Sequence, residues 1–401
     1  MHFGAMLKKF IDNDNLARRT LVRMLQPRSP VGVLDPVLIW SAILLLLFGL
    51  VMVYSASIAF TAEREYYFLI RHGVFLAVGV TLGLLAFRVP MALWQHLAPW
   101  LFMVGVVLLV VVLIPQLGHV VKGARRWISL GVVNVQPSEF VKLFVALYAA
   151  DYTVRKLDVM GNLVRGFLPM LVAILLVGLL LLFEPDFGAF VVIAAIAFGV
   201  LFLGGLNIRA LLLLLSALAL VCVAVMIWGS SYRRERLFGF MDPWSNPSGW
   251  GYQPIHAMIA FERGGWFGAG LGASVEKLFY LPEPHTDFLF SVIAEELGFA
   301  GVFTVVMLFG LLVHRAFVIG CEAIVLGRCF AGLVAQAIGL WMGGQAFINM
   351  GMNMSVLPTK GLTLPLMSFG GSGLVANCLA LAILLRVDWE VRQLKCGGGG
   401  G

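Results

Sequence analysis

Residues 280–298 read YLPEPHTDFLFSVIAEELG, a stretch in which an apolar segment begins directly after two prolines, a histidine and several acids. From Phe288 onward the segment is apolar enough to cross a lipid bilayer as a helix, which takes about 20 such residues. Acidic side chains inside a spanning helix are rare and usually face a polar interior or a partner. The stretch therefore predicts a spanning helix with Asp287 at its mouth, and it raises the question of why Glu295 and Glu296 lie within it.

The rest of the chain is equally apolar. Of its 401 residues, 61% are hydrophobic and 12% are charged, and the mean hydropathy is +0.96. A soluble globular domain is about half apolar and about a quarter charged. We therefore predict an all-α polytopic membrane protein with ten transmembrane helices, and we expect no nucleic-acid partner. The ten segments lie at about 37–57, 68–87, 97–115, 137–153, 167–183, 188–206, 209–228, 288–313, 329–350 and 371–387.

The basic residues predict the orientation of these helices. With the N-terminus in the cytoplasm, more than half of the 28 Lys and Arg residues fall on the cytoplasmic side, as the positive-inside rule requires. The chain then divides into a basic cytoplasmic tail (1–35), a ten-helix membrane domain (36–390) and a cytoplasmic tail (391–401) that ends in a glycine run resembling an artificial linker. The longest connection, 229–287, is an outer loop whose QPIHAMIAFERGG string predicts a short interfacial helix with Ile255 facing lipid.

Cations on the outer side suggest an anionic ligand. They gather in three outer segments, against the topological bias of the rest of the chain. Pairing with local acids or contact with anionic lipid headgroups is the alternative explanation. The three groups are Lys122, Arg125 and Arg126; Arg233, Arg234, Arg236, Arg263 and Lys277; and Lys360.

Asp287 is the first candidate for chemistry. One explanation is structural, because Thr286 and Asp287 together could cap the helix that follows. This explanation leaves Glu283 and His285, which stand beside them, without a role. The other explanation is that a carboxylate at the boundary of water and lipid serves as a general base, with His285 orienting it or a substrate.

A second group of candidates follows the third predicted span, in the string GARRWISLGVVNVQPSEFVKL. Arg125 and Arg126 provide paired guanidinium groups, which suit phosphate. Ser138 is a candidate helix cap. Glu139 and Lys142 are three residues apart, which predicts an ion pair inside the membrane.

Two further outer segments carry candidates. Prolines and glycines interrupt the string NMGMNMSVLPTKGLTLPLMSFGGSG (349–373), and irregular backbone at membrane depth either lines a cavity or is buried in protein. Lys360, its only charge, could hold a phosphate, or its side chain could reach up to the lipid headgroups. In the turn FEPDFGAF, Glu184 and Asp186 indicate either a cation site or solvated turn acids.

Taken in order, four strings resemble the SEDS family (shape, elongation, division and sporulation proteins). They are GARRWISLG with QPSEFVKL, EPDFG, YLPEPHTDF with AEELGF, and LPTKGLTLPLMSFGGSG. The resemblance covers about residues 36–390, and the LPTKG form and the long N-terminal tail are more similar to the cell-division branch than to the elongation branch. The chain departs from the family pattern at Phe279, where members often carry an acid, and in ERGGWFG, where they often read GRGEWFG.

The resemblance implies an activity, partners and a site. SEDS proteins polymerise peptidoglycan glycan strands from lipid II on the periplasmic face of the bacterial inner membrane. They work with a class B penicillin-binding protein, and the division branch works with other divisome membrane proteins at the septum. The family's HTDF aspartate matches Asp287, its LPTKG lysine matches Lys360, and its GARRW arginines match Arg125 and Arg126.

The implied reaction joins these residues in one site. Asp287 would be the general base for the acceptor hydroxyl, and the three cations would stabilise the undecaprenyl diphosphate leaving group. The donor sugar is α-linked and the glycan is β-linked, so the reaction inverts the configuration at the anomeric carbon. An inverting reaction without a covalent intermediate needs only one carboxylate as base. We expect substrate contacts from His285, Glu283 and Ser368. We expect a polar interior formed by Glu139, Lys142, Glu295 and Glu296.

Two other functions would use the same residues. A lipid II flippase needs a polar path through both leaflets, whereas the inner halves of the predicted helices are almost uniformly apolar. A non-catalytic scaffold of the division complex is the third possibility. A divalent cation (Mg²⁺ or Mn²⁺) could accompany the diphosphate, but the spacing of Glu184, Asp186 and Asp287 does not assign a metal site.

Overall fold

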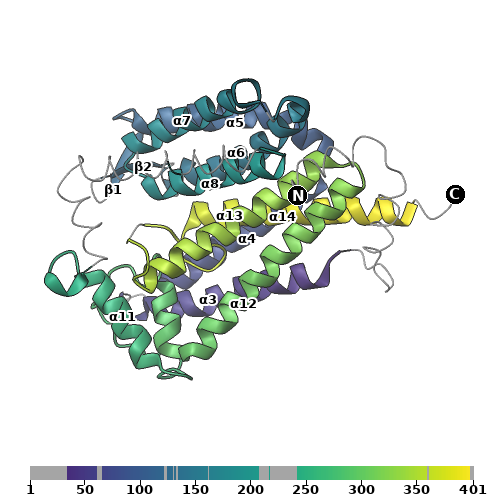
Figure 1. Cartoon of the computed structure of the whole chain (residues 1–401). Helices are drawn as coiled ribbons and strands as arrows, with labels where there is room; N and C mark the ends of the chain where they lie inside the picture. Colours follow the sequence, from purple (N-terminus) through teal and green to yellow (C-terminus); the bar gives the residue numbers. More distant parts are fainter. Residues whose placement is uncertain are drawn as a thin grey trace.

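The computed structural model describes residues 34–60, 66–121, 124–129, 131, 134–160, 162–206, 216, 242–358 and 361–397. In this part of the chain the fold is a bundle of long helices with a small sheet at one end (Figure 1). The bundle contains α3 (Pro36–Ser57), α4 (Tyr67–Arg88), α5 (Met91–Leu113), α6 (Pro137–Arg155), α7 (Leu168–Phe183), α8 (Phe187–Leu203), α12 (Leu289–Val325), α13 (Cys329–Asn353) and α14 (Gly371–Gly397). The outer segments contain β1 (Gly118–Val121), β2 (Ala124–Ser129), β3 (Asn134–Val135) and α11 (Tyr252–Gly264).

These helices correspond to nine of the ten predicted spans, and the predicted span at 209–228 lies outside the described residues. By length and composition, six helices among the described residues could cross a membrane, and the apolar helix α8 is slightly shorter. The polar segment 137–153, the least apolar of the predictions, is indeed a helix, α6. The eighth predicted span continues to Val325 instead of ending near residue 313, and Ala316, Ile319 and Ala323 of this extension are buried in protein.

The distribution of apolar and polar side chains is that of a protein surrounded by lipid. Large apolar residues point outwards on α4, α5 and α7, for example Leu84, Val107 and Val172, which are 63%, 57% and 58% exposed. Soluble proteins rarely expose contiguous apolar surface of this kind. Lys142 and Gln345, in contrast, are fully buried between the helices. This inverted distribution agrees with a polytopic membrane protein.

The prediction of an all-α chain is incomplete, because the outer segment between α5 and α6 forms a three-stranded sheet. β1 pairs with β2 and β2 pairs with β3, both antiparallel, so that Ile128 lies opposite both Gly118 and Val135. Its β-branched and aromatic residues favour strands. Gly118 is required where the sheet leaves α5, since a Cβ there would lie 1.8 Å from the Val112 carbonyl oxygen.

The helix predicted within the long outer loop is present as α11, which packs against α12. Ile255 is only 5% exposed, so the prediction that it faces lipid is wrong: the helix buries this side against protein. Trp266, just after α11, is 73% exposed.

The end of the bundle opposite the sheet joins the start of α3 to the end of α14 (Figure 1). The Asp35 N–H donates to Asp388 Oδ2 at 2.7 Å, and Arg392 Nη2 lies 3.0 Å from Asp35 Oδ2. Arg315 of α12 forms a second ion pair with Asp35. Both arginines were placed on the cytoplasmic side by the sequence, and the structure brings them together at one end.

Candidate active site

Asp287 lies directly before α12 but does not cap it. The N-cap residue is Phe288, whose side chain makes no capping hydrogen bond. Thr286 Oγ1 instead donates to the Glu283 carbonyl and to Glu283 Oε2, both at 3.2 Å. The explanation of Asp287 and Thr286 as a helix cap is therefore wrong, and the position of the half-buried Asp287 needs another reason.

Two buried asparagines of α13 hold the main chain of Asp287. Asn349 Nδ2 and Asn353 Nδ2 donate to the Asp287 carbonyl at 2.9 and 3.0 Å. Asn353 Oδ1 accepts from the N–H and hydroxyl of Ser291, in the first turn of α12, at 3.1 and 2.8 Å. Sequence analysis missed this pair, although asparagines four residues apart in the apolar string NMGMN are a signal of a shared helix face.

The same asparagines connect Asp287 with the segment after α13. Asn349 Nδ2 also donates to the Leu362 carbonyl at 2.6 Å. Gly361 lies so near that a Cβ built on it would be 3.4 Å from Asp287 Oδ2. The LPTKG string and the HTDF aspartate therefore meet in space. Lys360 lies outside the described residues, but Gly361, its neighbour in the chain, stands beside the carboxylate.

His285 is a wall of the site and not a solvated loop residue. It is 7% exposed, and its ring packs against those of Phe68 (α4) and Phe369, at centroid distances of 4.4 and 5.6 Å, in a cluster in which the two phenylalanine rings also contact each other. The Phe369 N–H donates to the His285 carbonyl at 2.9 Å. The contacts attach the segment that contains Asp287 to α4 and to the loop before α14.

The backbone before Asp287 is strained. Phe279 and Glu283 have φ values of 71° and 56°, in a region that side chains other than glycine rarely adopt. Such residues persist where the surrounding structure fixes them, and they concentrate at functional sites. The strain is consistent with a segment whose backbone conformation serves to position Asp287, at a cost to the stability of the segment.

Ser368 supports the loop before α14. Its hydroxyl accepts from the Leu364 N–H at 2.9 Å, and its own N–H donates to the Leu364 carbonyl at 3.0 Å. Ser368 is 4% exposed. These contacts give it a structural role, and the predicted contact with substrate stays a prediction.

Arg125 and Arg126, on β2, are attached to the ends of helices. Arg125 Nη1 donates to the Leu113 carbonyl at the end of α5, at 3.1 Å. Arg126 donates through Nε to the Glu184 carbonyl at 3.2 Å and through Nη2 to the Pro185 carbonyl, just after α7. The last carbonyls of a helix have no partner inside the helix, so these arginines complete α5 and α7.

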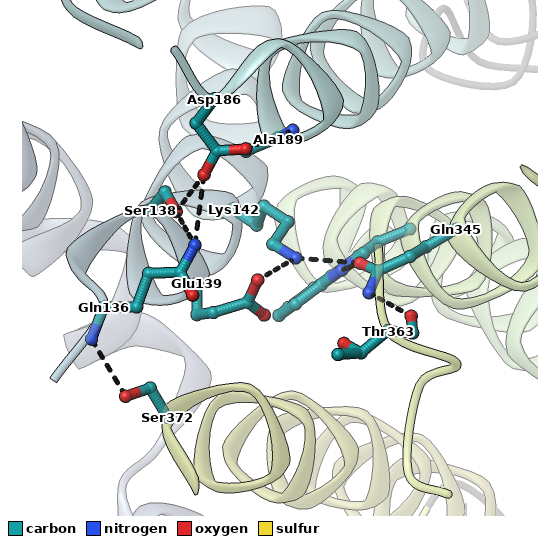
Figure 2. Close-up of polar contacts among 10 residues, drawn as sticks. Gln136, Ser138, Glu139, Lys142, Asp186, Ala189, Gln345, Thr363 and Ser372 are labelled. Atoms are coloured by element: carbon teal, nitrogen blue, oxygen red, sulfur yellow. Dashed lines mark hydrogen bonds and ion pairs between the residues drawn. The ribbon is translucent and has the colours of Figure 1, made fainter. Parts of the chain in front are cut away.

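Figure 2 shows the polar interior beside this site, and it confirms the ion pair predicted within α6. Lys142 Nζ lies 2.8 Å from Glu139 Oε1 and donates to Gln345 Oε1 at 2.8 Å. Gln345 Nε2 donates in turn to the Thr363 carbonyl at 2.9 Å. Trp341 Nε1 donates to the same oxygen of Gln345 at 2.9 Å. The chain of contacts joins α6 and α13 to the segment that follows Gly361.

Asp186 is also part of the interior, so its interpretation as a solvated turn acid is wrong. It is 3% exposed and caps α8, with Oδ1 accepting from the Ala189 N–H at 3.3 Å. Asp186 Oδ2 accepts from Ser138 Oγ at 3.0 Å and from Gln136 Nε2 at 3.1 Å (Figure 2). Ser138 therefore does not cap α6, whose N-cap is Gln136.

Glu184, in the turn between α7 and α8, is fully buried, and neither of its carboxylate oxygens accepts a hydrogen bond within the described structure. Burial and, to a smaller extent, the Asp186 charge raise the pKa of Glu184 to about 9, and Arg126 acts in the opposite direction. Among the described residues no three His, Cys, Asp or Glu side chains are grouped to hold a metal ion.

Residues 36–393 match a family model described as cell cycle protein, which covers FtsW, RodA and SpoVE. The chain belongs to this family. The match covers nearly the whole membrane domain and confirms the resemblance carried by the four strings.

Similar proteins agree with this membership. A relative from Aromatoleum aromaticum, named probable peptidoglycan glycosyltransferase FtsW, is 67% identical over 387 residues, which cover 95% of this chain and 94% of the relative. A solved structure described as the structural coordination of polymerization and crosslinking by a peptidoglycan synthase complex is 30% identical, with a TM-score of 0.72 over 89% of this chain and 98% of that one. A mutant of the rod shape determining protein RodA of Thermus thermophilus is also 30% identical, with a TM-score of 0.65 over 88% and 97%. This FtsW/RodA/SpoVE family member is thus a multi-pass membrane protein of the FtsW type.

Proposed function

We propose that this chain is a peptidoglycan glycosyltransferase that polymerises lipid II on the periplasmic face of the bacterial inner membrane, at the division septum. The observation that carries the proposal is the setting of Asp287. Two buried asparagines fix its carbonyl, and its carboxylate stands beside Gly361 of the LPTKG string. Membership of the family, and a relative named as a glycosyltransferase, support the same class of reaction.

In the proposed reaction Asp287 is the general base. Its carboxylate takes the proton of the acceptor sugar hydroxyl, and the hydroxyl oxygen attacks the anomeric carbon of the donor. The bond between this carbon and the diphosphate breaks, and undecaprenyl diphosphate leaves with the electron pair. One glycosidic bond forms for each bond broken between the anomeric carbon and the diphosphate, with inversion, so a second catalytic carboxylate is not needed.

Lys360 is assigned to the leaving group. Its chain neighbour Gly361 lies beside the Asp287 carboxylate, and in this proposal the lysine stabilises the negative charge that develops on the departing diphosphate. Arg125 and Arg126 have a smaller part in this proposal than the sequence predicted, because their guanidinium groups already hold the ends of α5 and α7. The two arginines attach the sheet to the ends of these helices. To bind a phosphate, their guanidinium groups would have to release the carbonyls that they now contact.

The walls of the site suit a lipid-linked substrate. Apolar surface on α4, α5 and α7 keeps the outer ends of these helices in the bilayer, where a polyprenyl tail also lies. His285, packed against two phenylalanine rings, is the proposed substrate contact on this wall. Glu283 and Ser368 complete the proposed substrate contacts. A divalent cation with the diphosphate remains a prediction to which we assign no residue.

The proposed partner is a class B penicillin-binding protein, which would crosslink the peptides of the new strands, within a larger group of divisome membrane proteins. The solved peptidoglycan synthase complex, to which this chain is similar, supports this choice. The test is the production of glycan strands from lipid II by the purified chain, alone and with the partner. Strands resolved on a gel are expected with the partner. If none form in either case while fluorescent lipid II crosses the bilayer of proteoliposomes, the chain is a flippase and the proposal is wrong.

A further inference from the structure

The outer part of α12 is broken at Gly298, and the break is where the long outer loop attaches. Gly298 has φ 63° and ψ −159°, which are not helical values. Backbone groups freed by the break pair with the loop on both sides of it. These hydrogen bonds run from the Ala269 and Gly270 N–H groups to the Glu295 and Glu296 carbonyls, at 2.9 and 3.0 Å, and from the Phe299 and Ala300 N–H groups to the Gly265 and Trp266 carbonyls, at 2.9 and 3.1 Å.

Glu295 holds the next turn of the loop with its side chain. Its Oε1 accepts from the Val275 N–H at 2.9 Å, and its Oε2 accepts from the Glu276 N–H at 3.3 Å and from the Ser274 hydroxyl. The Arg263 guanidinium lies 3.6 Å from the same carboxylate. Glu295 is fully buried. Burial of a carboxylate is costly unless hydrogen-bond donors satisfy its oxygens, as these donors do.

Glu296 extends the attachment to α3. Lys277 Nζ lies 2.6 Å from Glu296 Oε1, and Ser55 Oγ, from α3, donates to the same carboxylate at 2.7 Å. Lys277 Nζ is also 3.1 Å from Ser55 Oγ. Lys277 and Ser55 are 2% and 3% exposed, so this ion pair is sealed from water. We call Ser55, Ser274, Lys277, Glu295 and Glu296 the outer clamp.

The outer clamp closes a loop that contains Asp287. The Ser274–Glu295 and Lys277–Glu296 contacts join residues 21 and 19 positions apart, and Asp287 lies between them in the chain. The Leu281 N–H donates to the Glu276 carbonyl at 2.8 Å, so the clamped turn continues directly into the strained segment before Asp287. The asparagines of α13 fix the carbonyl of Asp287 from one side, and the outer clamp fixes both ends of its loop.

We infer that Glu295, Glu296 and Lys277 are positioning residues for Asp287: they set where its carboxylate stands relative to the acceptor hydroxyl, without contacting substrate. This inference rests on the proposed function for its effect on turnover. Displacement of a catalytic group by about 1 Å can lower a rate by about a hundredfold. Because the hydrogen bonds and ion pairs described above for the clamp involve none of the proposed substrate contacts, its loss should lower kcat and leave KM for lipid II near the wild-type value.

The test removes both charges of the sealed pair, in the double variant Lys277→Met with Glu296→Gln, so that no charge is left buried alone. We expect kcat to fall about tenfold at unchanged KM. The matched control is Asp388→Asn with Arg392→Met, which removes a buried pair at the other end of the bundle and should leave kcat unchanged per folded molecule. Equal kcat losses in the clamp variant and in the control would overturn the inference.

A double-mutant comparison separates positioning from general damage. In an Asp287→Asn background a clamp that acts through Asp287 should cause no further loss of residual turnover, whereas a clamp with an independent role would cause its full loss again.

A readout independent of activity separates this inference from the proposed function. Amide hydrogen exchange across residues 279–288 should be at least about tenfold faster in the clamp variant than in wild type, and unchanged in the control. Unchanged exchange in this segment would overturn the inference even if the chain is a glycosyltransferase. Faster exchange in a chain that makes no glycan would instead contradict only the proposed function.

Discussion

The two ends of α12 hold buried acids in different ways. At the inner end, two arginines balance two aspartates, because Arg315 and Arg392 both pair with Asp35 and Arg392 also pairs with Asp388. At the outer end, backbone N–H groups and hydroxyls satisfy most of the oxygens of Glu295 and Glu296, and Lys277 supplies one sealed cation. The inner end joins helix to helix, whereas the outer end joins a helix to a loop.

This difference indicates what each end is for. The ion pairs at the inner end fix the arrangement of α3, α12 and α14. Their carboxylates are engaged by arginines and are not available to a substrate. The outer arrangement fixes a strained loop and keeps the Asp287 carboxylate half-buried at its tip. If this comparison is correct, substitutions at the outer end should change turnover, and those at the inner end should change stability alone.

The largest of the graded effects is expected at Lys360. Lys360→Met keeps the length of the side chain and removes its charge, so turnover should fall by about a hundredfold while lipid II still binds, since the contact forms mainly as the diphosphate leaves. Lys360→Arg should recover part of the activity at best, because a planar guanidinium does not replace a point charge. The measurements are turnover and lipid II affinity in nanodiscs. Normal turnover in Lys360→Met would remove the lysine from the reaction and leave it as a side chain that reaches the headgroups.

A smaller effect is expected from Asn353→Leu. The change removes a donor to the Asp287 carbonyl and the acceptor of the Ser291 hydroxyl, while the Ser291 N–H keeps only its bond to the Phe288 carbonyl. Turnover should fall about tenfold through misplacement of Asp287, and the free energy of unfolding should fall by about 1–3 kcal/mol. Asn377→Leu is the matched control, because the buried Asn377 Oδ1 accepts no hydrogen bond in the described structure. Similar turnover losses in the two variants would argue against a special role for α13.

At the inner end, Arg392→Met should change stability and not turnover. It removes one of the two cations at Asp35 and the ion-pair partner of Asp388 within the described residues. Breaking a largely buried pair in this way costs about 3 kcal/mol. Thermal unfolding in detergent should show the loss, and glycan synthesis per folded molecule should match wild type. A selective loss of turnover would show that the inner end also takes part in the reaction.

The last effect is on stability alone and concerns Glu184, whose pKa burial raises from its ordinary 4.5 to about 9. The folded chain keeps a proton that the unfolded chain releases between these two pH values, so the free energy of unfolding falls as the pH rises through this window, by at most about 1.4 kcal/mol per pH unit. Glu184→Gln cannot ionise and lacks this loss. Its unfolding temperature should therefore exceed that of wild type by a few degrees at pH 8, and the two should converge near pH 5. An equal difference at both pH values would mean that Glu184 is ionised in the folded state.

Much of this fold could be predicted from the sequence, because hydrophobic length is sufficient to predict helices in a bilayer. The Glu139–Lys142 ion pair could also be predicted, since its spacing on a helix brings the two side chains together. The three-stranded sheet was missed, because its strands are short and contain arginines that read as a charged loop.

The candidate site was predicted only in part. The strings identified Asp287, but its true supports come from Asn349 and Asn353, which are 62 and 66 residues away in the chain. Arg125 and Arg126 were assigned to phosphate because their partners, the ends of α5 and α7, become neighbours only after folding. Local patterns show which residues are unusual in lipid, whereas tertiary contacts decide what those residues do.

The most direct test of this account compares two carboxylate-to-amide changes in one assay, Asp287→Asn at the outer end and Asp388→Asn at the inner end. Both substitutions are nearly isosteric, and both are made in the same preparation with lipid II and the partner transpeptidase. We predict that Asp287→Asn lowers glycan synthesis by at least about a hundredfold, as expected for loss of a general base, while Asp388→Asn keeps wild-type turnover per folded molecule. Near-normal synthesis by Asp287→Asn would contradict the account.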